Sequence, residues 1–184
     1  MANIHHFYSL ANDHQIAEGI GWYKTWSRKI AKLDPTNPRR AWAIFSILSP
    51  LNSVERNWEL TKLIYATNGN LTSGYFRKQL AKANAIHNGE LPAEESSISK
   101  TPVKTISFFR NFTGNMEAVT IDSWMLKAVF NVNFKKGDKT PSMSSVRNYN
   151  SIVEAVRIGA ANELDIAPAE LQAIVWVVIR ELWG

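Results

Sequence analysis

Residues 104–130 read KTISFFRNFTGNMEAVTIDSWMLKAVF, a stretch that predicts two helices separated by a turn and a short extended segment. The first helix is amphipathic and ends before Gly114-Asn115, and the second begins near Ser123. Lys104 therefore lies on the first turn of one helix and Asp122 at the start of the next, 18 positions later. An amine and a carboxylate presented in this way are expected to share one cleft, so this pair is the first candidate for catalysis.

The rest of the chain has the same helical periodicity. Apolar residues recur at helical spacing, Pro and Gly mark the ends of the segments, and no strand pattern is longer than AVTI at 118–121. The sequence therefore predicts an all-α fold. The further predicted helices span about 16–30, 42–48, 53–66, 76–86, 146–160 and the residues from 168 onward.

Composition limits the class of protein. The chain has 184 residues, 45% of them hydrophobic and 20% charged, which is typical of a globular protein. It contains no cysteine, and its four histidines do not cluster, so we expect no metal, no iron–sulfur cluster and no other cofactor. The longest apolar run, 173–179, is too short to span a bilayer, and no secretory signal is visible, so we expect a cytoplasmic protein. A net charge of +5 and a pI near 9.5 favour nucleic acid as the partner.

Five stretches together carry a family resemblance. They are AWAIFSILSP (41–50), KANAIHNGELP (82–92), KTISFFRNF (104–112), AVTIDSWMLKAVF (118–130) and ELQAIVWVVIRELWG (170–184). The first resembles an apolar helix closing in L-L-S-x-Q, and the second a K-A-x-x-I segment leading to G-x-V-P. The third resembles a helix opening in K-T-A-N, and the fourth a V-D-T-H-V-x-R-V segment. The fifth resembles the helix before an iron–sulfur loop. These are motifs of the helix-hairpin-helix DNA glycosylase superfamily, and the chain resembles a reduced, bacteriophage-type relative of endonuclease III.

The resemblance implies a fold, an activity and a pair of catalytic residues. The fold is a single compact unit (1–184) with two helical lobes and a DNA groove between them, one lobe at 41–130 and the other formed by 1–40 plus 131–184. The activity is cleavage of the N-glycosidic bond, with or without scission of the strand at the abasic site. Lys104 matches the nucleophilic lysine of the family and Asp122 its essential aspartate, at the same interval. The iron–sulfur loop is absent.

The chain departs from the family at the hairpin. The family's L-P-G-V-G motif places backbone N–H groups against a DNA phosphate, whereas residues 98–103 read ISKTPV and contain no glycine. Pro102 also lacks a donor. We expect Lys100 to supply positive charge at this position. Trp124 replaces the histidine that usually follows the aspartate, and it is expected to border the groove.

Other residues are candidates for DNA contacts. Leu51 or Asn52, in the turn after the 42–48 helix, matches the position whose side chain fills the gap left by an extruded nucleotide. The lysines near Asp122 are expected to contact phosphates; they are Lys127, Lys135 and Lys136. The alternative for Leu51 and Asn52 is that their turn only connects two helices. The tryptophans on helical stripes are predicted to belong to the core; they are Trp22, Trp26, Trp42, Trp58 and Trp176.

A simpler interpretation exists for each catalytic candidate. Asp122 is also a good N-cap residue, and Lys104 alone reads as a solvated lysine on a first helical turn. A lysine amine attacks only when it is deprotonated, which burial and a helix N-terminus favour. Two other functions remain open on this fold. One is a phage-type transferase that modifies DNA bases and leaves the glycosidic bond intact, and the other is a non-catalytic DNA-binding derivative.

Overall fold

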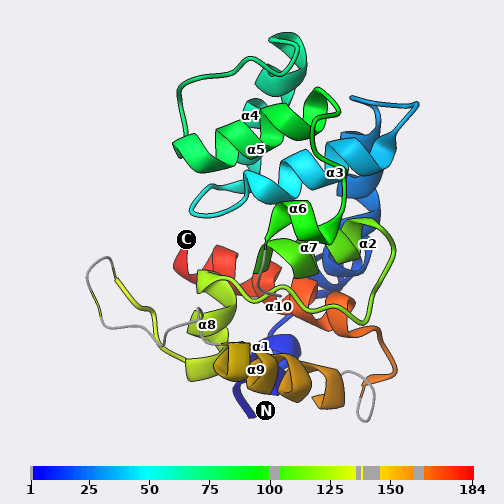
Figure 1. Ribbon diagram of the computed structural model, residues 1–184. Coiled ribbons are helices and arrows are strands. Elements are labelled where there is room, and N and C mark those ends of the chain that lie inside the picture. The colour runs from blue at the N-terminus through cyan, green and yellow to red at the C-terminus, as the bar shows by residue number, and fades with distance from the viewer. Residues whose placement is uncertain (1, 100–103, 136–137, 139–145, 160–163) are drawn as a thin grey trace. The chain divides into compact units, whose positions relative to one another are not determined.

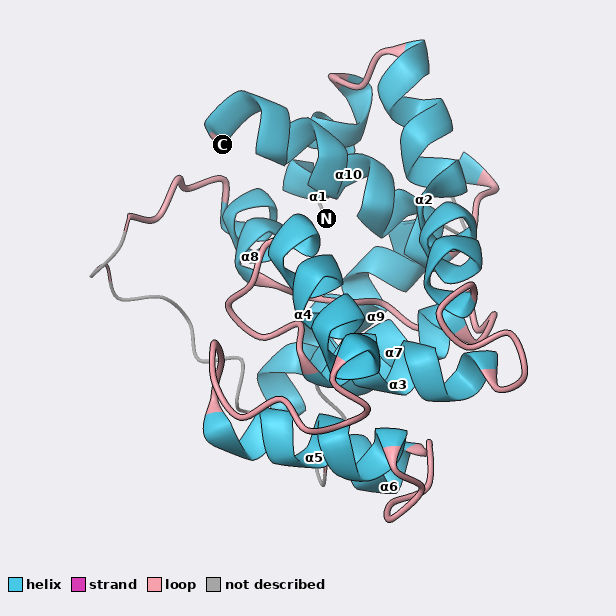
Figure 2. Ribbon diagram, turned by 90° about the horizontal axis from the view of Figure 1, so that it is seen from above, coloured by secondary structure: helices cyan, strands magenta, loops and turns pink. Residues whose placement is uncertain are grey.

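The computed structural model describes residues 2–99, 104–135, 138, 146–159 and 164–184. Within these ranges the regular structure is helical and contains no strand, which confirms the all-α class (Figures 1 and 2). The helices are α1 (Ala2–Ser9), α2 (Asp13–Ala31), α3 (Pro38–Ile47), α4 (Val54–Ala66), α5 (Arg77–His87), α6 (Glu95–Ile98), α7 (Lys104–Phe112), α8 (Ser123–Phe130), α9 (Val146–Gly159) and α10 (Pro168–Trp183).

Local sequence signals explain where several of these helices begin. Pro38 and Pro168 each occupy the first turn of a helix, where a missing N–H costs nothing and the fixed φ favours helical backbone. The side chain of Asn37 caps α3, and the Ser53 hydroxyl caps α4 by accepting from the backbone N–H of Arg56 at 3.1 Å. Each cap satisfies a donor that has no partner inside its helix.

The chain divides into two compact units. Unit 1 comprises residues 1–23 and 114–184, and unit 2 comprises residues 24–113. Helix α2 begins in unit 1 and ends in unit 2. These boundaries differ from the predicted lobes, 41–130 and 1–40 plus 131–184, and the difference matters for the candidate pair. Lys104 belongs to unit 2, whereas Asp122 belongs to unit 1.

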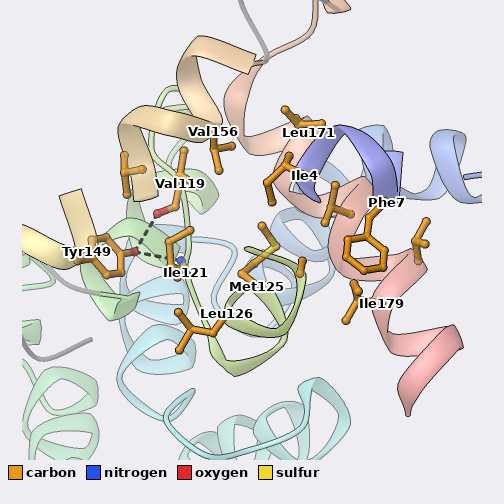
Figure 3. Close-up of a cluster of buried hydrophobic side chains, with 14 residues drawn as sticks. Ile4, Phe7, Val119, Ile121, Met125, Leu126, Tyr149, Val156, Leu171 and Ile179 are labelled. Atoms are coloured by element: carbon orange, nitrogen blue, oxygen red, sulfur yellow. Dashed lines mark hydrogen bonds between the residues drawn. The ribbon is translucent and has the colours of Figure 1, made fainter. Parts of the chain in front are cut away.

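The core of unit 1 is built by α1, α8, α9 and α10 together with the segment before α8. Its buried side chains include Ile4, Met125 and Leu171, and Figure 3 shows how they converge. Gly19 of α2 lies directly against α10, because a Cβ at this position would come within 2.6 Å of the backbone N and Cα of Ile174. A side chain of any size is therefore excluded there.

The core of unit 2 is built by α3 to α7. Apolar faces of these helices meet around a central α3, whose residues Ile44 and Phe45 are fully buried. The turn between α2 and α3 is held by Asp34, which is only 4% exposed. Its carboxylate accepts hydrogen bonds from the Arg40 guanidinium, the Tyr65 hydroxyl and the Thr36 hydroxyl. The buried charge of Asp34 is thus compensated on several sides.

Candidate functional site

Asp122 is the N-cap of α8, as its sequence context allowed. Its Oδ1 accepts hydrogen bonds from the backbone N–H groups of Trp124 and Met125, at 2.9 and 3.0 Å. Its Oδ2 accepts a third hydrogen bond, at 3.1 Å, from the indole Nε1 of Trp176 in α10. The residue is half-buried. Three N–H donors therefore fix the carboxylate at one helix N-terminus, where the helix dipole also favours negative charge.

The segment that leads into Asp122 is fixed by a buried tyrosine of α9. The hydroxyl of Tyr149 donates to the carbonyl of Val119 at 2.8 Å and accepts from the backbone N–H of Ile121 at 3.1 Å (Figure 3). Both contacts are buried, so water cannot replace them. Tyr149 thereby sets the position from which α8 and its capping carboxylate start.

A second buried tyrosine lies on the α2 side of the same unit. The hydroxyl of Tyr23 donates to Oε1 of Gln172 at 2.6 Å. Burial raises the pKa of Tyr23 well above its ordinary range, the hydrogen bond with Thr120 acts in the opposite direction, and the negative charge of Asp122 raises it further. Tyr23 therefore remains a protonated hydrogen-bond donor at any physiological pH.

Two tryptophans near Asp122 each carry a cation over their rings. The guanidinium of Arg180 lies 4.5 Å from the ring centre of Trp176, and the ammonium of Lys127 lies 4.0 Å from that of Trp124. Trp124 and Trp176 are half-buried. Unit 1 thus holds the Asp122 carboxylate next to two partly buried indoles, one contributing its backbone N–H and the other its ring N–H.

The lysines predicted to contact phosphates differ in their availability. Lys127 also donates to Oδ1 of Asn133 at 3.0 Å, so its ammonium is held by the segment that follows α8. Burial lowers the pKa of Lys127, and the neighbouring charge of Lys135 lowers it further. Lys135 itself is exposed. Lys136 lies outside the described residues.

Lys104 is held in unit 2 by the end of α3. Its Nζ donates to the backbone carbonyl of Ser49 at 3.3 Å, and the residue is half-buried. Its position at the first described residue of α7 agrees with the predicted first turn. Lys100 and the rest of the predicted hairpin, residues 100–103, lie outside the described residues.

The turn after α3 presents Leu51 to solvent. Its side chain is 89% exposed, and its backbone has a φ of 58°, in the left-handed region that leucine rarely adopts. The turn is anchored on both sides of this residue. The Asn52 side chain donates to the carbonyl of Leu48 at 2.7 Å, and the hydroxyl of Tyr75 donates to the carbonyl of Pro50. A strained, exposed leucine on a fixed turn is unusual enough to suggest a function.

The structure therefore sorts the predicted site residues into two groups. Unit 1 brings Asp122, Trp124 and Lys127 together through α8. Unit 2 brings Lys104 close to the turn of Leu51 and Asn52 through the Ser49 carbonyl. The proximity of Lys104 to Asp122 remains a prediction.

Two residues of the site were not predicted from the sequence as site residues. Trp176 was placed in the core on the basis of its helical stripe, and Tyr149 was assigned only to the buried face of its helix. Trp176 is instead half-buried and bonds to Asp122. Their chemistry could have indicated such a role, because a buried or half-buried Trp or Tyr usually needs a hydrogen-bond partner for its polar atom.

Comparison with protein families places the chain in one of them. Residues 1–182 match a family described as a family of unknown function, DUF7178. The chain belongs to the DUF7178 family. No curated protein and no solved structure matches this DUF7178 chain. None of its described helices has the length and hydropathy needed to span a bilayer. Within the described ranges, no group of three or more His, Cys, Asp or Glu is placed to hold a metal ion.

Proposed function

We propose that this DUF7178 chain is a DNA base-processing enzyme of the helix-hairpin-helix glycosylase type, with the two-lobed fold of that superfamily. Its most direct activity on this proposal is cleavage of an N-glycosidic bond. Three observations support it: the described fold is all-helical, the sequence motifs occur in the order of the family, and Asp122 has the geometry of a fixed acidic group.

The observation that carries the proposal is the hydrogen bonding of Asp122. An ordinary N-cap needs only the contacts to the first turn of its helix, which Oδ1 already makes. The additional bond from the Trp176 indole fixes the second oxygen as well, although Asp122 is half-exposed. Such pre-orientation is of use where a charge must be stabilised at a defined point in a reaction.

In the proposed reaction, the bond between the sugar C1′ and the base nitrogen breaks, and the electron pair leaves with the base. Positive charge then develops on the sugar ring, and the carboxylate of Asp122 stabilises it electrostatically. Water adds at C1′, and the proton it loses neutralises the departed base, so the products are an abasic site and a free base. Trp124 and Trp176 both hydrogen-bond to this carboxylate, and in this proposal their rings border the pocket for the extruded nucleotide.

Strand scission is the part of the proposal that depends on Lys104. A deprotonated Lys104 amine would attack C1′ of the abasic sugar, lose water to form a Schiff base, and permit elimination at the 3′ oxygen. The contact of Nζ with the Ser49 carbonyl shows that the amine is held in place rather than extended into solvent. It also means that the Lys104 side chain must leave this carbonyl before it can react.

Leu51 is the proposed gap-filling residue. Its exposure and its left-handed backbone mean that the folded state maintains an unfavourable conformation to present an apolar side chain. Asn52 instead bonds back to the end of α3, which makes it a support for the turn. Lys135, which is exposed, fits a phosphate contact better than Lys127 does.

The test is an incubation of the full-length protein with duplex DNA that carries a panel of modified bases, followed by mass spectrometry of the released products. We expect a free base from at least one substrate, and at least a 100-fold lower rate for Asp122→Asn, because the isosteric amide keeps a cap but loses the charge. The matched control is Glu117→Gln, an exposed acid five residues earlier, which should act as wild type.

The same assay discriminates among the alternatives. An altered nucleoside without free base would replace the glycosylase proposal with base transfer on the same fold. Equal activity in wild type and Asp122→Asn would contradict a catalytic role for Asp122. For the lyase half, borohydride should trap a covalent complex with abasic DNA in wild type and in Glu117→Gln, and no complex in Lys104→Ala. A trapped complex in Lys104→Ala would assign the nucleophile to another amine.

A further inference from the structure

The charges of the chain are divided unevenly between the two units. Unit 2 contains 14 Lys and Arg against 6 Asp and Glu, a net charge of +8, whereas unit 1 contains 7 against 10, a net charge of −3. Together these give the +5 of the whole chain. A polyanion is therefore attracted mainly to unit 2, although the candidate carboxylate Asp122 and the lysines after it lie in unit 1.

Within unit 2, one cluster combines this charge with aromatic rings. Trp26 of α2 and Trp58 of α4 are half-buried and meet edge to face, with ring centres 6.2 Å apart. The exposed Lys29 places its ammonium 4.2 Å from the centre of the Trp26 ring and 4.9 Å from that of Trp58. The opposite end of this cluster is anchored in the core, because Trp26 contacts the fully buried ring of Phe45.

Lys29 differs from the other lysine of the cluster in its partners. Lys62 lies 5.8 Å from the Trp58 ring, but its ammonium forms an ion pair with Glu59 at 2.8 Å. Among the described residues, no carboxylate lies within ion-pair distance of Lys29. Its charge therefore rests on two indole faces, an arrangement that holds an exposed ammonium only weakly.

A phosphate is a better partner for this ammonium than an indole. Hydrogen bonds between two charged groups are stronger than a cation–π contact at an exposed site, and the four-carbon stem of lysine lets the ammonium move. When Lys29 turns to a phosphate, it uncovers parts of both indoles. Bases can then stack on them, as they do on the aromatic platforms of single-strand binders.

We infer that the cluster formed by Trp26, Lys29 and Trp58 is a contact surface for single-stranded nucleic acid. In the bound state the Lys29 ammonium moves from the indoles to a backbone phosphate, and unpaired bases take its place against Trp26 and Trp58. Lys32, which is exposed and directly follows the last residue of α2, provides a second phosphate contact. Duplex DNA is not expected to use the surface in this way, because its base faces are stacked on each other.

This inference rests on the proposed function only in taking nucleic acid as the polyanion. It involves neither Asp122 nor Lys104, and it assigns a role to aromatic residues that their helical stripes predicted as core. It also places strand contact on unit 2, at residues other than the Leu51 turn.

Binding of the full-length protein to a fluorescently labelled oligothymidylate of about 12 nucleotides, measured by anisotropy, tests the inference. We expect Trp58→Leu to bind at least about fivefold more weakly than wild type, and Trp58→Phe to recover most of the affinity, because a smaller aromatic ring still stacks. Lys29→Ala should lower the slope of log K against log salt by about 0.7, the value for one single-strand phosphate contact. Circular dichroism and thermal unfolding of each variant confirm folding.

Lys24→Ala is the matched control for charge, since Lys24 is exposed on the same helix, five positions from Lys29 and about 140° around its axis. It should leave the salt slope closer to that of wild type than Lys29→Ala does. Equal binding by wild type and Trp58→Leu, equal salt slopes for Lys29→Ala and Lys24→Ala, or equal weakening of duplex binding by Trp58→Leu would each overturn the inference.

The two proposals fail separately. Absence of base release by the wild type, with Trp58-dependent oligothymidylate binding intact, would contradict the proposed function and support this surface. Asp122-dependent base release together with Trp58-independent strand binding would support the proposed function and contradict this surface.

Discussion

Units 1 and 2 hold their candidate site residues in different ways. In unit 1 the Asp122 carboxylate has three N–H donors, and one of them comes from a residue 54 positions away in the chain. In unit 2, Leu51 has an exposed side chain and a left-handed backbone conformation, held by hydrogen bonds to its neighbours in the turn. One unit stabilises a charged group with many partners, and the other maintains strain around an apolar one. We therefore expect substitution of Asp122 to lower the stability of the protein, and substitution of Leu51 by glycine to raise it.

The dependence of unit 1 on distant contacts gives the largest expected effect. Gly19→Ala puts a Cβ within 2.6 Å of the backbone of Ile174, so α2 and α10 must separate. Overpacking typically costs about 1–3 kcal/mol, and we expect the upper end of this range because the neighbour is backbone. Urea denaturation should show this loss, and amide hydrogen exchange should show that protection falls first in unit 1.

The neighbouring exposed residue provides the control for this prediction. Glu18→Ala lies on the same helical turn and should change stability by no more than about 0.5 kcal/mol. If Gly19→Ala removes protection equally from α3, α4 and α5, then the two units unfold as one cooperative structure. The two units would then differ in how they hold their candidate site residues, but not in stability.

The second effect belongs to unit 2 and depends on pH. Burial raises the pKa of Asp34, but hydrogen bonds from Arg40, Thr36 and the backbone of Asn37, together with the Arg40 charge, lower it more, so the net pKa lies below its ordinary value. A carboxyl whose pKa is lower in the folded state stabilises the fold above its unfolded pKa of about 4. This contribution disappears as the pH falls through the folded value.

Arg40→Met tests this linkage. Removal of a charged donor from a buried carboxylate should cost about 2 kcal/mol at pH 7. The cost should be smaller at pH 3, because the charge that Arg40 compensates is progressively lost as the pH falls through the pKa of Asp34. Urea denaturation of both proteins at the two pH values measures the difference. The exposed Lys32→Met variant should show neither the loss nor the pH dependence, and a loss for Arg40→Met that is independent of pH would show that Arg40 acts by packing alone.

The sequence predicted most of the helices because their apolar residues recur at helical spacing between recognisable start and stop signals. It did not predict α6, whose four residues are too few to show a helical period, or the eight-residue α1; α8 is equally short, but Asp122 marks its start. The N-cap role of Asp122 was open to prediction because it depends on the next three residues. Its bond to Trp176 was not, because a side-chain partner 54 positions away depends on tertiary packing.

The turn at Leu51 shows another limit of local rules. Turn chemistry assigns positive φ to Gly or Asn, and would place Asn52 rather than Leu51 in the left-handed region. The structure instead uses the Asn52 side chain to bond the end of α3, which leaves Leu51 with the strained backbone. The positive φ of Leu51 thus accompanies bonds made by the residues on both sides of it, which local turn rules do not include.

Leu51→Gly is the smallest and most diagnostic prediction. Glycine adopts positive φ without steric cost, and the leucine side chain makes little contact at 89% exposure, so the variant should be more stable by about 0.5–1 kcal/mol. Thermal unfolding measures the gain.

On duplex DNA with a modified base, the same variant should release base more slowly if Leu51 fills the gap left by extrusion. Glycine at Asn68, which also has positive φ, is the matched control: Asn68→Gly relieves little strain, because asparagine tolerates this region, and should change neither property. A stabilised Leu51→Gly protein with unchanged base release would mean that the strain at Leu51 serves only the turn.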